Sequence, residues 1–241
     1  MHCYFYDGTT EGFYTAVFYA YADPLALLAC EHIQMGIDDI SMPVTTDPEK
    51  ADRVLKKLRE YDRYAEGEID TVLRSCFPDR AERAFLYLRL LIRRRGPVRE
   101  MHADPAVSDA LFVVRRVRKE THNMTGFLRF METAGGVLYA PYTPDNDITE
   151  YLFPHFKARF GALSFVIHDL RREKACLYNG KTAVMTRLSK GEIVLSDGED
   201  AFQNLWREYY ASVNIPERSR PKQMRGYMPV RYWKFLPEKR P

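Results

Sequence analysis

Residues 164–185, SFVIHDLRREKACLYNGKTAVM, hold the clearest secondary-structure pattern in the chain. Ser164–Leu170 and Lys174–Tyr178 are short runs rich in β-branched and apolar residues, which predicts two strands. Asn179-Gly180 is a tight-hairpin signal that leads into a third strand, Thr182–Met185. Because such hairpins replace βαβ crossovers, the pattern predicts an α+β protein rather than an α/β protein.

The rest of the C-terminal half adds a hairpin and two helices. Phe127–Met131 and Val137–Tyr142 flank Gly135-Gly136, which predicts two more strands. Asp147–Phe160 and Asp200–Val213 show the apolar spacing of amphipathic helices, and Ile193–Leu195 is a short strand candidate. We therefore expect a C-terminal half of antiparallel strands with packed helices.

The N-terminal half is predicted to be mainly helical. His2–Tyr6 is its one expected strand, and helical spacing runs through the segments Thr10–Tyr21, 51–61, 69–76, 81–91 and 105–124. We expect residues 1–241 to form one compact unit. If it divides, Gly96–Ala103 is the boundary, which gives a mainly helical lobe 1–98 and an α+β lobe 99–241 that ends in the basic segment 214–241.

Positive charge is concentrated at the end of the chain. Asn214–Arg240 carries eight Lys and Arg against two Glu, whereas the whole chain has a net charge of +3. Aromatic residues lie between these cations, a combination that suits a phosphate backbone and its bases. The same composition also suits an ordered tail that packs on an acidic surface.

Composition narrows the class of protein. No apolar run approaches the roughly 18 residues of a membrane span, and the N-terminus lacks a signal-type pattern, so we expect a cytoplasmic protein without a membrane partner. The cysteines Cys3, Cys30, Cys76 and Cys176 are scattered and form no CxxC, so we predict no metal site and no cofactor.

Two helices carry candidate anion contacts. Arg115, Arg118 and His122 fall together at one edge of the apolar face of the 105–124 helix, as a phosphate-contacting stripe would. His155 and Arg159, four residues apart, could form an anion clamp on the next helix. The alternative for both sets is a solvated flank or a structural histidine.

The remaining candidates lie in loops and at a strand end. Asp145 and Asp147 precede a helix, where turn and N-cap chemistry explains both. His168-Asp169 ends a strand and precedes Arg171-Arg172, which suits an acid/base pair or an anion contact. No GxSxG, HExxH or P-loop motif supports catalysis.

Several motifs together resemble a family of uncharacterised DNA-metabolism or DNA-repair proteins, a domain of unknown function. They are YFYDGTTEGFYTAVFYAY (4–21), RKETHNMTGFLRF (118–130), PDND with PHFKARF (144–160), FVIHDLRR (165–172), LWREYYASVNIPER (205–218) and MPVRYWKFLPE (228–238). The family is encoded beside a DNA-modification or repair radical SAM protein, and a related domain is fused to uracil-DNA-glycosylase-like domains. Many relatives have a histidine between the two aspartates, where this chain has Asn146, which weakens a metal or acid/base proposal there.

The resemblance implies a DNA-related role but no reaction, and three hypotheses remain open. The first is a DNA-binding accessory protein for the radical SAM enzyme. Its nucleic-acid contacts are expected at Arg115, Arg118, His122, Arg129, Arg159, Arg171, Arg172, Arg218, Lys222, Arg225, Arg231 and Lys234. The second is an enzyme that processes damaged DNA with His122, Asp145, His155, His168 and Asp169. The third is a protein-interaction module for the radical SAM or glycosylase-like partner.

Overall fold

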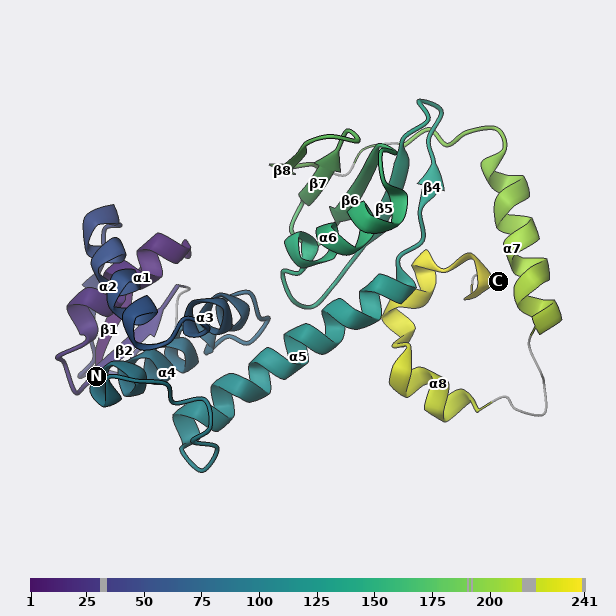
Figure 1. Cartoon of the computed structure of the whole chain (residues 1–241). Coiled ribbons are helices and arrows are strands. Elements are labelled where there is room, and N and C mark those ends of the chain that lie inside the picture. Colours follow the sequence, from purple (N-terminus) through teal and green to yellow (C-terminus); the bar gives the residue numbers. More distant parts are fainter. Residues whose placement is uncertain (31–33, 190, 192, 214–219, 240–241) are drawn as a thin grey trace. The chain divides into compact units, whose positions relative to one another are not determined.

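The chain contains two compact units, Met1–Arg118 and Lys119–Pro241. The computed structural model describes residues 1–241 except 31–33, 190, 192, 214–219 and 240–241. Helix α5 (Pro105–Phe127) is a single helix whose residues belong to both units (Figure 1). The expected single compact unit with lobes 1–98 and 99–241 stays a prediction.

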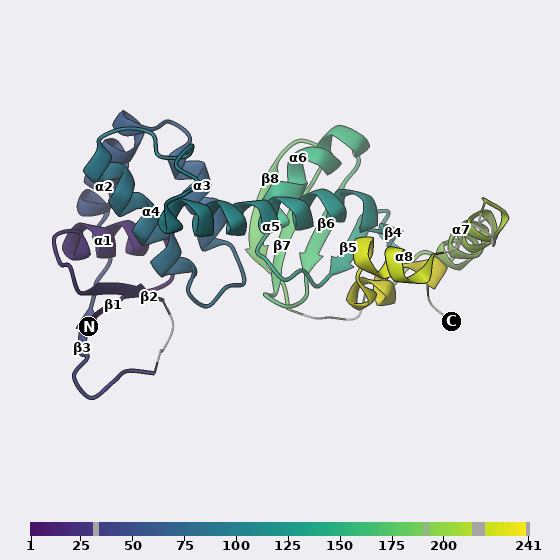
Figure 2. The same ribbon diagram turned by 90° about the horizontal axis from the view of Figure 1, so that it is seen from below.

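Within its described residues, the first unit combines a small parallel sheet with helices. Strand β1 (His2–Phe5) lies between β2 (Ala26–Ala29) and β3 (Ile40–Pro43) and pairs with both in parallel. The sequence did not predict β2 and β3, because ALLA has no alternation and ISMP is exposed and contains a proline. Figure 2 shows the helices gathered on one side of these strands. They are α1 (Thr10–Ala20), α2 (Pro48–Tyr61), α3 (Ala65–Leu73) and α4 (Arg80–Arg94).

The second unit contains a five-stranded sheet in the order β4-β5-β6-β7-β8, and the predicted α+β class is confirmed. Its strands are β4 (Met131–Glu132), β5 (Leu138–Tyr142), β6 (Phe165–Asp169), β7 (Lys174–Tyr178) and β8 (Ala183–Arg187).

One strand pair departs from the antiparallel expectation. The pairs β4–β5, β6–β7 and β7–β8 are antiparallel, but β5 and β6 are parallel. The reason is helix α6 (Thr149–Phe160), which connects these two strands as a crossover and returns the chain in the same direction. The two carboxyl ends of β5 and β6 are therefore neighbours.

The turn between β7 and β8 explains why a glycine follows Asn179. The Asn179 Oδ1 accepts the backbone N–H of Lys181 (3.0 Å) and of Thr182 (2.8 Å). Gly180 has a φ of +85°, and a Cβ at this position would lie 2.2 Å from the backbone oxygen of Ala162. Both the conformation and the lack of space thus require glycine here.

The core of the second unit is aromatic. Phe165 of β6 lies 6.0 Å from Phe130, 5.8 Å from Phe160 and 5.0 Å from Tyr178, measured between ring centroids. Phe130 also lies 4.7 Å from Phe160. These rings join the segment before β4, helix α6 and the sheet into one core.

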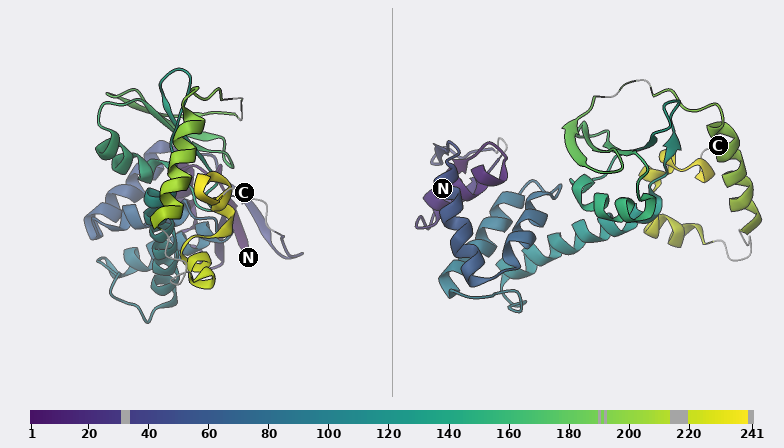
Figure 3. Two further views of the ribbon diagram at one scale, coloured as in Figure 1. Left: turned by 90° about the vertical axis from the view of Figure 1, so that its right-hand side faces the viewer. Right: turned by 45° about the horizontal axis from the view of Figure 1, so that its top comes forward.

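The chain ends in helical segments beside this core. The right-hand view of Figure 3 shows α7 (yellow-green) standing apart from the sheet. The expected strand Ile193–Leu195 is present only as an isolated bridge between Leu195 and Thr133. The C-terminal segments are α7 (Glu199–Val213), α8 (Pro221–Tyr227), η2 (Val230–Phe235) and η3 (Pro237–Lys239).

Candidate nucleic-acid interface

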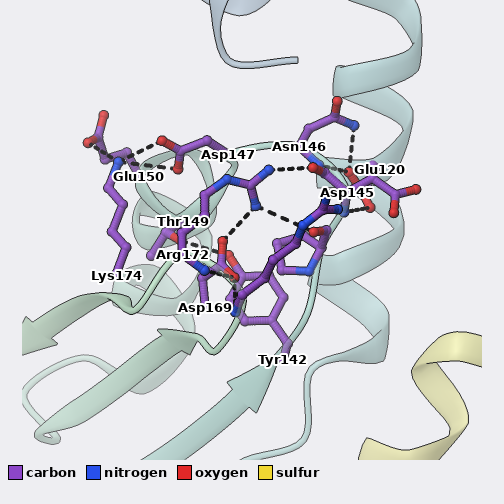
Figure 4. Close-up of polar contacts among 12 residues, drawn as sticks. Glu120, Tyr142, Asp145, Asn146, Asp147, Thr149, Glu150, Asp169, Arg172 and Lys174 are labelled. Atoms are coloured by element: carbon purple, nitrogen blue, oxygen red, sulfur yellow. Dashed lines mark hydrogen bonds and ion pairs between the residues drawn. The ribbon is translucent and has the colours of Figure 1, made fainter. Parts of the chain in front are cut away.

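The loop between β5 and α6 lies at the carboxyl ends of two parallel strands. Tyr142 of β5 is in register with Asp169 of β6, so the loop that follows Tyr142 meets the turn that follows Asp169. Figure 4 shows the resulting polar cluster, in which Asp145 and Asp147 lie near Arg172 and Lys174. The parallel pairing thus brings together residues that are 27 positions apart in sequence.

Arg172 holds this loop in place through contacts inside the protein. Its Nη1 lies 2.8 Å from Oδ2 of Asp169, a carboxylate that is fully buried. The guanidinium also donates to the backbone oxygens of Pro144 and Asp145. Arg172, which the sequence suggested as a nucleic-acid contact, is therefore engaged by internal acceptors, whereas its neighbour Arg171 is exposed.

Lys174 pairs with the other end of the loop. Its Nζ lies 2.9 Å from Oδ2 of Asp147 and 3.0 Å from Oε1 of Glu150. Burial alone would lower the pKa of Lys174, but hydrogen bonds and charge from these two carboxylates raise it. The arrangement gives Asp147 a structural role in positioning the start of α6.

Glu120 is the central acceptor of the cluster, and sequence reasoning missed it. The buried carboxylate accepts the backbone N–H groups of Asp145 and Asn146, each at 2.9 Å, and the Asn146 side-chain amide at 2.6 Å. The Tyr232 hydroxyl donates to it as well, at 2.5 Å. The sequence did contain one indication of this role. Glu120 is an acidic residue in a basic stretch of the helix, and it lies three residues after the buried Val117, so both are on the same side of α5.

The C-terminal segment is packed onto the unit by ion pairs. Arg231 Nη2 lies 2.5 Å from Oδ2 of Asp145, and Arg129 Nη2 lies 2.7 Å from Oε1 of Glu238. Burial, together with the hydrogen bond to Glu120, raises the pKa of the Tyr232 hydroxyl. These contacts match the ordered-tail alternative for this part of the tail.

The other described basic candidates of the C-terminal segment lie in α8 and η2. Lys222 and Arg225 are exposed, and the Lys234 ammonium lies 4.8 Å from the centroid of the Phe235 ring. Arg218 lies outside the described residues. Arg231 pairs with the carboxylates of Glu120 and Asp145.

The structure does not bring the five catalytic candidates into one constellation. His168 is buried, with Nδ1 2.7 Å from the Tyr139 hydroxyl and Nε2 2.8 Å from the backbone oxygen of Leu188. As consecutive residues of β6, His168 and Asp169 point to opposite faces of the sheet. His122 and His155 are exposed on two different helices. His168 and Asp169 are thereby accounted for as structural residues.

Helix α5 presents an exposed basic side. Arg115, Arg118, Lys119 and His122 are all exposed, and helical geometry places them within an arc of about 100°. Within the described chain, none of the four has an ion pair with a carboxylate. Lys119 was not among the sequence candidates. This side is opposite the buried side of the helix, which carries Val113, Val117, Glu120 and Met124.

A groove of about 740 Å³ lies beside α7. The rings of Phe130 and Phe160 line one part of it, and Trp206 and Tyr209 of α7 line another. Arg159 is exposed at the groove, with its guanidinium 5.8 Å from the centroid of the Phe160 ring. Sequence periodicity predicted an amphipathic helix over Asp200–Val213 but not what its apolar side lies against, so it missed this groove.

Comparisons with known proteins establish the family alone. Across the described residues, no helix is both long and apolar enough to cross a membrane. No curated protein matches the chain. Residues 78–238, more than half of the chain, match the model of a domain of unknown function, DUF4130, and the protein belongs to that family.

Proposed function

We propose that this chain is a DNA-binding accessory protein that acts with a radical SAM enzyme of DNA modification or repair. The family resemblance of the motifs supports the DNA context and this partner. A uracil-DNA-glycosylase-like protein is the second partner that the resemblance suggests. Chemistry on DNA is assigned to the partner, because His168 and Asp169 are engaged by internal hydrogen bonds and an ion pair.

The observation that carries the proposal is the exposed basic side of α5. Other cations that the sequence suggested are held by the protein's own acceptors, as Arg129, Arg172 and Arg231 illustrate. Arg115 and Arg118 are exposed and have no carboxylate ion pair in the described chain. Guanidinium groups in this situation can neutralise phosphates and release counterions without breaking an internal interaction.

The test is a titration of duplex and single-stranded DNA at several salt concentrations, with the wild type and with Arg115→Gln/Arg118→Gln. Each phosphate contact contributes about 0.9 to the log–log salt slope on duplex DNA and about 0.7 on single strands. The double variant should therefore lower the slope by up to about 1.8 on duplex DNA. Lys56→Gln/Lys57→Gln is the matched control, since it removes two exposed lysines that pair with Asp52 and Glu60.

The control should leave affinity and slope unchanged, although it changes the net charge by the same amount. A wild-type protein whose binding to both DNA forms is absent or insensitive to salt would overturn the proposal. An equal loss in the control pair would show that only net charge matters and that α5 is not the contact.

A further inference from the structure

The groove beside α7 leaves aromatic faces uncovered. Phe202 is 69% exposed, Tyr209 is 57% exposed and Trp206 is 38% exposed. These three residues occupy one side of α7 at helical spacing. They line the groove together with Phe130, which precedes β4, and Phe160, which ends α6. A helix that packed this side on its own unit would bury such rings, so the groove has room for a ligand.

The indole of Trp206 is held in a defined orientation. Its Nε1 donates to Oε2 of Glu238 at 2.8 Å, and the Arg129 guanidinium lies 5.3 Å from the ring centroid. Arg129 itself pairs with the other oxygen of Glu238. Tyr209 lies 5.7 Å from Trp206 between ring centroids. Rings that are already oriented lose little conformational freedom when a planar ligand stacks on them.

The polar groups of the groove are mostly occupied. Glu199 is buried, and its two carboxylate oxygens accept the backbone N–H of Glu132 and the side-chain amide of Gln203, each at 2.9 Å. Arg159 is the exposed cation of the lining, and it has no carboxylate ion pair in the part of the chain that the structure describes. What remains for a ligand is a set of π faces, the positive charge of Arg159 at the rim and the exposed carboxylate of Glu132 at the end of β4.

We propose that this groove binds unstacked bases of single-stranded DNA, with Trp206, Tyr209 and Phe202 as stacking surfaces and Arg159 on a phosphate. The proposal rests on the proposed DNA-binding function and adds the form of DNA that is recognised. Since the lining offers rings rather than free donors and acceptors, binding should tolerate any base. The rim guanidinium favours this polyanion over an apolar protein helix, which would leave Arg159 unpaired.

The experiment measures binding by fluorescence anisotropy of three labelled probes of 12 nucleotides. They are oligo-dT, an abasic strand of equal length, and a duplex. Base stacking on an aromatic side chain contributes about 1–3 kcal/mol per base, so Trp206→Ala should weaken oligo-dT binding by roughly 5- to 150-fold. The abasic strand and the duplex should bind the variant and the wild type within a factor of two. Tyr64→Ala, which removes an aromatic ring that is 56% exposed in the first unit, is the matched control.

Two further variants keep the proposal testable if Trp206→Ala perturbs the fold, which circular dichroism would reveal. Tyr209→Ala should weaken oligo-dT selectively, whereas Arg159→Gln should weaken oligo-dT and the abasic strand alike. Unchanged oligo-dT affinity in both variants, while Arg115→Gln/Arg118→Gln still weakens binding, would overturn the groove assignment and leave the proposed function standing. Groove variants that retain DNA binding but lose a co-purifying protein would overturn it in favour of protein docking. A wild type that binds none of the probes would overturn both proposals.

Discussion

Replacing Glu120 by glutamine tests whether one buried carboxylate holds the β5–α6 loop and the C-terminal segment together. Oε1 of Glu120 accepts the backbone N–H of Asp145 and the Tyr232 hydroxyl, and Oε2 accepts two N–H groups of Asn146. An amide has one oxygen, so Glu120→Gln retains one of these acceptor sites. The other site becomes an NH2 group that faces two donors.

The expected cost follows from this count of lost acceptors. Hydrogen bonds to charged groups contribute about 1.5–3 kcal/mol each, so losing two lowers the free energy of unfolding by about 3 kcal/mol or more. Tyr232→Phe removes a single donor and leaves Glu120 with three, so by the same count it should cost about 1.5–3 kcal/mol, roughly half the loss in Glu120→Gln. Glu208→Gln, on the exposed side of α7, should cost close to nothing.

Urea unfolding followed by tryptophan fluorescence measures these changes in the second unit, because both tryptophans, Trp206 and Trp233, lie there. With an m-value of about 1.5 kcal/mol/M, the Glu120→Gln variant should lose about 2 M in its unfolding midpoint. A Glu120→Gln variant as stable as Tyr232→Phe would refute the reasoning, since the carboxylate would then not be the common acceptor.

Two further predictions concern a turn and a pH dependence. Gly180→Ala should destabilise the second unit by at least about 1–2 kcal/mol more than Gly136→Ala, as measured by urea unfolding. Both glycines have positive φ, but only at Gly180 would a Cβ meet a backbone oxygen, that of Ala162 at 2.2 Å, so equal losses would contradict the steric argument. Burial alone would raise the pKa of Glu238, yet hydrogen bonds from its own backbone and from Arg129 lower it below the ordinary value of 4.5. Because the pKa of Glu238 is lowered in the folded state, its ionised carboxylate stabilises the fold at pH values above its unfolded pKa, and this stabilisation is lost as the pH falls. The stability advantage of wild type over Glu238→Gln should therefore shrink below about pH 4.5, and a difference that stays constant from pH 7 to pH 3.5 would refute this.

Local sequence patterns predicted much of the fold. The β6–β7–β8 hairpins followed from alternating apolar residues and from Asn179-Gly180, because such turns require backbone conformations that few residues adopt. Helix α5 followed from apolar residues at helical spacing and an N-terminal Pro105. The same spacing grouped Arg115, Arg118 and His122 on one side of α5, but it placed them at the edge of the apolar face, whereas they lie opposite the buried residues.

Long-range pairing was outside the reach of these patterns. The sequence could not show that β5 and β6 run parallel, because strand direction depends on where α6 packs and not on local propensity. This pairing brings Arg172 to Asp145 and so turns a suggested phosphate contact into an internal brace. The role of Glu120 was hidden for the same reason, since its partners at positions 145, 146 and 232 are distant in sequence.

The amino-acid sequence alone determined the α+β class, most helices of the chain and the side of α5 that carries positive charge, because each depends on residues within a few positions of one another. The tertiary structure decided which cations remain available to a ligand. Arg129, Arg172 and Arg231 are held by carboxylates or backbone oxygens from distant segments, whereas Arg115 and Arg159 have no carboxylate ion pair in the described chain. The groove beside α7 was likewise decided by packing, because apolar spacing marks one side of a helix but cannot tell whether the fold covers it.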